Sequence, residues 1–251
     1  MYGASIGSFV QVIALRFNVS PIMKGRSKCL SCGEALRASD LIPIVSYLLL
    51  RGKCKYCKSA YGVSALVVEV LFGLVFLLLY KIIIIGQPTL MLSLWWLLYY
   101  TALFATLGVM ALYDKAHSYI PVPFIATFLG ITAIMFIMRI VENPELSTFL
   151  APIFVALPFF AIWFITKGKG LGFGDIILFF GVGAFFGILQ GFAVLAISVW
   201  IGALYGLYIK FIVEKKKNHM TAIPFVPFIV IAFLFVLFTG VDVFSIAMSF
   251  S

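Results

Sequence analysis

The chain has 251 residues, of which 64% are hydrophobic and only 11% are charged, and its mean hydropathy is +1.18. A soluble domain of this size needs far more polar surface, so this composition excludes that class and indicates a polytopic membrane protein. We therefore use the formal net charge of +9 to predict membrane orientation, and we expect no nucleic-acid partner.

Apolar runs along the chain predict an all-α fold with about eight membrane-spanning helices. Their expected ranges are 2–15, 63–85, 89–112, 122–141, 148–166, 175–190, 191–213 and 223–248. A helix over 2–15 reaches only about 21 Å, against roughly 30 Å of hydrocarbon, so we expect the given start to lie inside the true first helix. Whether 175–213 forms one span or two stays open, because several glycines offer break points: Gly181, Gly183, Gly187 and Gly191.

Charges in the connecting segments predict the orientation of these helices. One side of the membrane receives the many Lys and Arg residues of 16–62, together with Lys115, Lys167, Lys169, Lys210 and Lys215 to Lys217. The other side receives only Lys81 and Arg139. The positive-inside rule makes the first side cytoplasmic, and this topology brings Asp114 and Asp175 to the same cytoplasmic face.

All four cysteines lie in the first cytoplasmic segment, as the pairs Cys29/Cys32 and Cys54/Cys57. Two C-x-x-C pairs predict a closed, structural zinc site with four thiolate ligands, although their separation slightly exceeds the usual zinc-ribbon range. Neighbouring lysines and arginines are expected to lower the thiol pKa values. Two disulfides or a redox dithiol are the alternatives, which a reducing cytoplasm disfavours.

Between the cysteine pairs lies the apolar run 41–50, which is too short to span a membrane. We expect an interfacial segment there, in contact with membrane lipid. The predicted organisation is a first, truncated membrane helix at 1–15, a cytoplasmic zinc-binding cap at 16–62, and a membrane bundle at 63–251 that carries the catalytic site.

Asp114 and Asp175 lie at the ends of apolar runs, where a carboxylate is costly to desolvate. Each aspartate alone could be a helix cap or a boundary residue. Gly172 and Gly174 are expected to let the chain turn tightly and to leave room for another segment to approach Asp175, at a helix N-terminus that favours a carboxylate. Two carboxylates at one aqueous surface suggest paired-carboxylate chemistry.

Five short motifs, in chain order, carry a resemblance to a known family. They are Gly7-Ser8-Phe9-Val10-Gln11, the cysteine segment, Asp114 with Ile120-Pro121, Gly172-Phe173-Gly174-Asp175, and Ile223-Pro224-Phe225-Val226-Pro227-Phe228. Over nearly its whole length the chain resembles the type IV prepilin peptidases, which are bifunctional leader peptidases and N-methyltransferases of bacterial pilus and type II secretion systems. It departs from the family pattern at Gln11, where an Asn is usual, and at Ile177, where a Lys is common.

The resemblance implies an aspartyl protease of the bacterial inner membrane that cleaves type IV prepilins or pseudopilins after a glycine. Asp114 and Asp175 would be its catalytic residues, and the four cysteines would bind zinc. The enzyme would then methylate the new N-terminal residue from S-adenosylmethionine. Loss of the family's lysine at Ile177 is expected to alter rate or specificity if that lysine tunes the aspartate or contacts substrate.

Two carboxylates held close together should share a proton, so one can activate water as general base while the other donates to the scissile carbonyl and then to the leaving amine. The sequence does not say which aspartate has which role. His117 and His219 are expected to be solvated loop residues, so no Ser/His/Asp alternative is convincing.

Glu69 is an acid inside the predicted second span, where it could bind the methyl donor or the substrate amine, or simply form an interhelical hydrogen bond. No Rossmann-like fingerprint marks a donor site. The alternatives for the whole chain are a peptidase without methyltransferase activity, a zinc-loop scaffold, and a proton-coupled transporter. A transporter would place its acids nearer the midplane and in repeated halves, which this sequence lacks.

Overall fold

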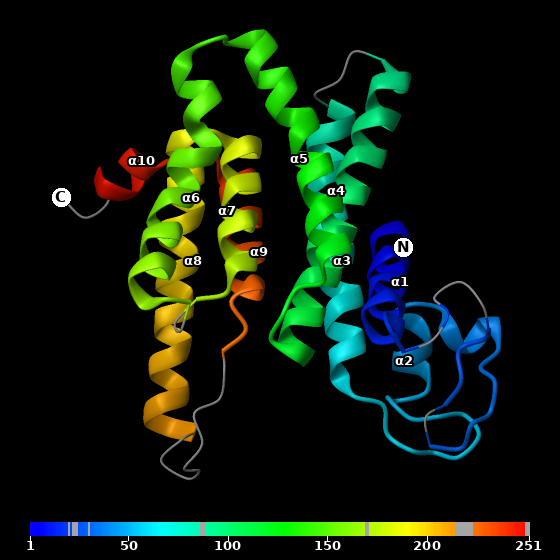
Figure 1. Cartoon of the computed structure of the whole chain (residues 1–251). Helices are drawn as coiled ribbons and strands as arrows, with labels where there is room; N and C mark the ends of the chain where they lie inside the picture. The colour runs from blue at the N-terminus through cyan, green and yellow to red at the C-terminus, as the bar shows by residue number, and fades with distance from the viewer. Residues whose placement is uncertain are drawn as a thin grey trace. The chain divides into compact units, whose positions relative to one another are not determined.

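The computed structural model describes residues 1–19, 21, 25–29, 31–85, 89–168, 171–213 and 223–248, and these are almost entirely helical, with no β-strand among them (Figure 1). Five helices are long and apolar enough to cross a membrane: α3 (Val63–Ile85), α4 (Leu90–His117), α5 (Val122–Glu142), α6 (Leu146–Thr166) and α8 (Ile188–Tyr208). The helices α7 (Phe173–Phe186) and α9 (Val226–Thr239) are shorter and apolar, and α1 spans Tyr2–Arg16. The predicted all-α membrane class is confirmed.

Three predicted boundaries need correction, and one open question is answered. The 175–213 run is two helices, but the break lies at Gly187, with φ 81° and ψ −169°, and not at the predicted division at 190/191. The predicted last span 223–248 is wrong as a single helix: α9 stops at Gly240, which has φ 68°, before the short α10 (Val243–Met248). The helix α4 continues beyond the predicted end at 112, so Asp114 lies within its last turn.

The chain packs as two compact units, Met1–Val109 and Met110–Ser251, which we describe separately. The predicted division at 1–15, 16–62 and 63–251 stays a prediction. Some residues used in the orientation argument, and one histidine, lie outside the described residues: Lys24, Lys169, Lys215 to Lys217 and His219.

In the first unit, α1 packs against α3 through small residues. A Cβ on Gly7 would lie 2.9 Å from the Phe72 Cβ and 3.0 Å from the Val68 carbonyl oxygen, so a larger residue would force the helices apart. One turn further along α1, the Gln11 side-chain amide donates to the Ala65 carbonyl oxygen (3.2 Å). The glycine motif near the chain start is therefore the face of α1 that meets α3.

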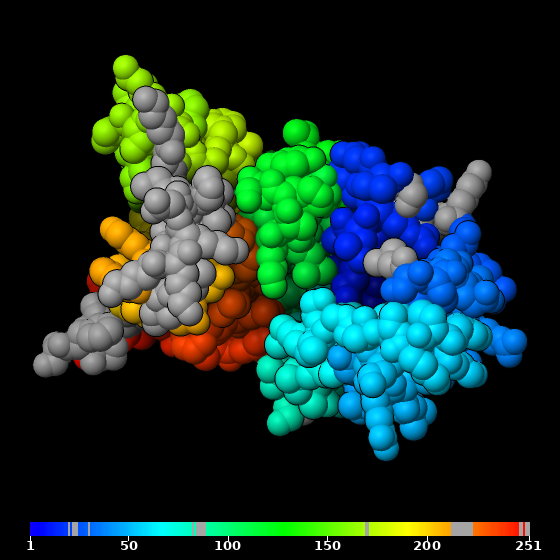
Figure 2. All heavy atoms as spheres, turned by 90° about the horizontal axis from the view of Figure 1, so that it is seen from below, coloured from blue at the N-terminus to red at the C-terminus, as the bar shows by residue number. Residues whose placement is uncertain are grey.

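The cap contains two short helices, η1 (Ala38–Leu41) and α2 (Val45–Leu49). Figure 2 draws the described residues of 25–62 as blue to cyan spheres. Asp40 organises the cap by accepting hydrogen bonds from the Arg37 backbone N–H and the Tyr56 hydroxyl, both 3.1 Å. The Arg37 N–H is the main reason why the Asp40 pKa lies below its ordinary value. Leu49, at the end of α2, is 78% exposed. The interfacial role predicted for 41–50 stays a prediction.

In the second unit, α5, α6 and α8 all pack against α7, and α9 packs against α8. Close approach depends on glycines in α7. The Phe128 ring of α5 occupies the space that a side chain on Gly181 would need, and a Cβ on Gly183 would lie 2.7 Å from the Ala151 carbonyl oxygen of α6. The helix that carries Asp175 is thus the buried centre of this unit.

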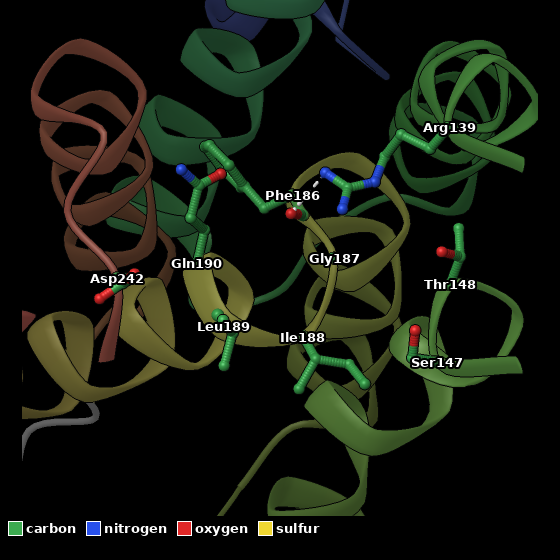
Figure 3. A pocket seen from close by; sticks show the side chains of 9 residues that line it. All are labelled: Arg139, Ser147, Thr148, Phe186, Gly187, Ile188, Leu189, Gln190 and Asp242. Atoms are coloured by element: carbon green, nitrogen blue, oxygen red, sulfur yellow. Dashed lines mark hydrogen bonds between the residues drawn. The ribbon is translucent and has the colours of Figure 1, made fainter. Parts of the chain in front are cut away.

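The C-terminal end of α7 lies beside a cavity of about 480 Å³ (Figure 3). Arg139 donates from Nη1 to the Phe186 carbonyl oxygen (2.6 Å), one of the carbonyls left unpaired at a helix end. Its guanidinium fills the space beside Gly187 that a side chain would occupy. Asp175 lies in the first turn at the opposite end of α7, so this cavity is not the site of the aspartates.

Candidate active site and metal centre

Asp114 is held by the backbone of a distant helix. Its side chain is buried, with 6% of its surface exposed, and its Oδ2 accepts a hydrogen bond from the Val226 N–H (3.0 Å). Val226 is the first residue of α9, where a backbone N–H has no partner inside the helix. The motif around Pro224 and Pro227 therefore supplies the donor that fixes Asp114.

Asp175 lies in the first turn of α7 and is partly buried. Gly172 precedes the helix with φ −72° and ψ 139°, which any residue can adopt, so the tight turn expected from glycine freedom is absent at this position. A Cβ at Gly172 would lie 3.4 Å from Asp175 Oδ2, an ordinary van der Waals distance. A Cβ on Gly174 would lie 3.3 Å from the Ile120 Cδ1, so Gly174 leaves room for the Ile120 side chain.

The structure brings Asp114 and Asp175 close enough for their charges to repel each other. They come from the last turn of α4 and the first turn of α7, both within the second unit. Two carboxylates that repel each other do not readily ionise together. Such a pair can supply a general base and a general acid at the same time.

An aromatic cluster lies on both sides of Asp114 in the sequence. The buried Tyr113 pairs its hydroxyl with that of Tyr119 (2.7 Å), and the His117 ring stacks on Tyr113 at 4.2 Å between centroids. His117 is exposed, as expected, but it is the last residue of α4 rather than a loop residue. A spacing of six residues across a helix end follows no helical repeat, so no sequence signal marked the tyrosine pair.

The four cysteines of the cap converge. Their Sγ atoms all lie within 4.8 Å of one another, the Cys29 and Cys57 Sγ atoms are 3.8 Å apart, and none of the four forms a disulfide. Sulfurs bound tetrahedrally at about 2.3 Å from zinc lie about 3.8 Å apart, so this donor set fits a zinc ion. The disulfide alternative does not match this arrangement.

The two cysteine pairs form two separate backbone turns of the same type, and this shared geometry explains why their sulfurs converge. The Cys29 N–H donates to the Glu34 carbonyl oxygen (2.9 Å), and the Cys54 N–H donates to the Ser59 carbonyl oxygen (2.8 Å). Four residues after the first cysteine of each pair, Gly33 and Lys58 have positive φ angles of 73° and 61°. Each turn directs two sulfurs to one side, as a metal-binding knuckle requires.

Backbone N–H groups also tune the thiols. Hydrogen bonds from the Cys32 and Ser31 N–H groups lower the pKa of Cys29 to about 6, and the Cys57 N–H lowers the pKa of Cys54. The neighbouring lysines and arginines, which were expected to lower the pKa values of the thiols, are not the main cause of these shifts. At Cys32 the Glu34 N–H acts in the same direction, but partial desolvation of the sulfur and the neighbouring thiols outweigh it and raise the pKa to about 11. A divalent cation would offset this repulsion and let all four thiols ionise.

Glu69 connects α3 to the cap. Its Oε2 accepts a hydrogen bond from the Ile44 N–H (2.7 Å), just before α2. Ile44 has φ 65°, a strained conformation for a β-branched residue, and the hydrogen bond to Glu69 helps to hold it. The partner of Glu69 is therefore the backbone of the cap rather than another membrane helix.

Comparison with known proteins supports the family resemblance predicted from the sequence motifs. Residues 1–83 match the bacterial peptidase A24 N-terminal domain, and residues 101–207 match the type IV leader peptidase family. A prepilin leader peptidase/N-methyltransferase of Legionella pneumophila is 31% identical over 86% of this chain and 72% of its own length. Proteins of the same name from Pseudomonas aeruginosa and Vibrio cholerae are 29% and 25% identical, over 82% and 93% of this chain and 69% and 92% of their own lengths. No solved structure matches significantly. The chain is a bacterial multi-pass membrane protein that belongs to the type IV leader peptidase family.

Proposed function

We propose that this chain cleaves the leader peptide of type IV prepilins or pseudopilins, with Asp114 and Asp175 as the catalytic pair. The observation that carries the proposal is that Asp114 and Asp175, from separate helices, lie near enough for their charges to interact, with Asp114 held by the N-terminus of α9. The family match and the relatives named as prepilin leader peptidases support the substrate class.

In this proposal the ionised aspartate takes a proton from water, and the resulting hydroxide attacks the scissile carbonyl carbon. The protonated aspartate donates to the carbonyl oxygen, and collapse of the tetrahedral intermediate sends a proton to the leaving amine. Either aspartate serves either role in this scheme. The Val226 N–H, whose position depends on α9, orients the Asp114 carboxylate. Gly172 lies beside the Asp175 carboxylate, and Gly174 leaves space for the Ile120 side chain.

We further propose that the enzyme lies in the bacterial inner membrane with the aspartates and the cap at its cytoplasmic face. The asymmetric distribution of Lys and Arg supports this orientation. Free, convergent cysteines also suit the reducing cytoplasm. Zinc held by Cys29, Cys32, Cys54 and Cys57 would close the cap as a structural site.

The test of the proposed function uses the full chain in lipid vesicles with a purified prepilin and S-adenosylmethionine. Mass spectrometry of the product reports loss of the leader and gain of a methyl group as separate mass changes. We expect both. A prepilin that keeps its leader in the presence of folded, zinc-loaded enzyme would contradict the proposal.

Methylation of the new N-terminus is the second activity we propose, with S-adenosylmethionine supplying the methyl group. Glu69 is the candidate residue for holding the donor or the amine. Its hydrogen bond to Ile44 engages Oε2 and gives it a structural role as well. The two roles can be separated, because a glutamine keeps a side-chain oxygen that accepts from the Ile44 N–H but removes the charge.

Glu69→Gln is expected to reduce methylation about tenfold, the size of one lost contact to a charged group, and to leave cleavage within about twofold. Glu69→Ala loses the acceptor too, so it should also expose the cap to limited proteolysis. The measurement is mass spectrometry of processed pilin. Full methylation by Glu69→Gln would exclude a role for the charge, and equal loss of both activities would leave Glu69 a structural residue only.

A further inference from the structure

The backbone that follows Asp114 takes a constrained path. Between His117 and Val122 the chain makes a short connection from α4 to α5. Ser118 has φ 57°, and its N–H donates to the Asp114 carbonyl oxygen (2.7 Å), which closes the helix. A non-glycine residue in the left-handed region needs support from its surroundings. The connection is thus tied at its start to the backbone of Asp114 itself.

The tyrosine pair holds the middle of this connection. Tyr113, which is 2% exposed, directly precedes Asp114, and Tyr119 directly precedes Ile120. Their hydroxyls lie 2.7 Å apart and their rings meet edge to face, with centroids 5.2 Å apart. The pair therefore joins the residue before one aspartate to the loop that follows it.

The connection between α4 and α5 in turn contacts the segment that carries Asp175. The Ile120 Cδ1 lies 3.3 Å from the position of a Cβ on Gly174, and Ile125 of α5 lies 3.7 Å from the same position. Gly174 directly precedes Asp175. A shift of Ile120 would therefore move, or lose contact with, the turn that carries the second carboxylate.

We infer that Tyr119, through its hydroxyl pair with Tyr113, is a positioning residue that sets the separation of Asp114 and Asp175. It acts through Ile120 on Gly174 and touches neither carboxylate. Catalysis is sensitive to displacements of about 1 Å, because the acid and the base must both reach the reacting atoms. This inference rests on the proposed leader-peptidase function.

The test is a double-mutant cycle on Tyr113→Phe and Tyr119→Phe in the full chain, with prepilin as substrate. Each single variant is expected to lower the kcat of cleavage roughly tenfold with KM within about twofold, because substrate binding keeps its contacts while the carboxylates move. The double variant should be no slower than either single variant, because both remove the same bond. Tyr205→Phe, which removes a hydroxyl from α8, is the matched control and should keep wild-type kcat.

A second pair of variants tests the contact with Gly174. Gly174→Ala adds a methyl group 3.3 Å from the Ile120 Cδ1 and should lower kcat. Adding Ile120→Val removes that Cδ1 and should restore most of it, which a general loss of stability would not produce.

The wild-type rate, measured in parallel, tests the proposed function separately. Wild-type cleavage combined with unchanged kcat in Tyr119→Phe would overturn the inference alone. Losses that multiply in the double variant would overturn it as well, because the two hydroxyls would then act independently. Absence of cleavage by the wild type would overturn both the function and the inference.

Discussion

Asp114→Asn and Asp175→Asn are each expected to reduce prepilin leader cleavage by at least about 100-fold, the scale of losing a general acid or base. Each change is nearly isosteric and removes only the ionisable group. In Asp114→Asn the side-chain oxygen can still accept from the Val226 N–H, so α9 should keep its place. The measurement is the cleavage rate under single-turnover conditions, with the amount of folded protein determined in parallel.

Two further variants sharpen this test. Asp242→Asn changes an aspartate that caps α10 rather than the pair, so it should cleave at the wild-type rate. The double variant Asp114→Asn/Asp175→Asn should be about as slow as either single variant, because residues that act as one unit are not additive. Near-normal cleavage by either single variant would show that the pair is not the catalytic centre.

Purified protein is expected to carry one zinc ion per chain, and loss of any one of the four cysteine ligands should abolish this. Structural zinc sites in small folds contribute apparent binding energies of about 10–16 kcal/mol, more than a segment as small as 25–62 gains from its own core. Cys54→Ser should therefore remove the metal and open the cap to limited proteolysis. Metal analysis and the cleavage pattern of a soluble protease are the two measurements.

The controls for the zinc prediction come from the same cap. Ser39→Ala changes an exposed residue outside the two cysteine turns and should keep both the metal and the protease resistance. Cys29 and Cys54 are buried whereas Cys32 and Cys57 are exposed, so serine at the buried positions should also cost more stability. Markedly less than one zinc per chain, in protein prepared without chelators, would count against the site.

Helix positions in this protein follow from local sequence. Long apolar runs predict α3, α5 and α6 to within two residues of their observed ends. The break between α7 and α8 falls at Gly187, one of four candidate glycines, and not at the predicted division at 190/191. A glycine is also present at 240, but the residues around it are so apolar that the run 223–248 predicts one continuous span. The left-handed conformation of that glycine ends α9 instead. Composition says that a segment belongs in a membrane, but not where inside it the helix stops.

The chemistry of the candidate sites could also be predicted from the sequence, because it depends on which residue types recur at short spacing. Two C-x-x-C pairs predicted a converging set of thiols, and the structure gathers them without a disulfide. The two aspartate motifs predict a catalytic pair of carboxylates, and this pairing stays a prediction for two groups near enough to repel each other. The sequence could not predict which backbone groups lower the pKa of the thiols. The N–H groups of Ser31 and Cys57 do so, and any side chain at those positions would leave such an N–H in place.

By itself, the sequence determined the membrane class, the helix-forming segments and the identity of the acids and thiols, since each depends on composition or local spacing. Only the tertiary structure decided that the Val226 N–H holds Asp114, that Ile44 donates to Glu69, and that Ile120 rests against Gly174. These contacts join residues far apart in the chain, and most use backbone groups that every residue carries. Helix packing alone selects which of those identical groups come within hydrogen-bonding distance, so no sequence pattern could mark them in advance.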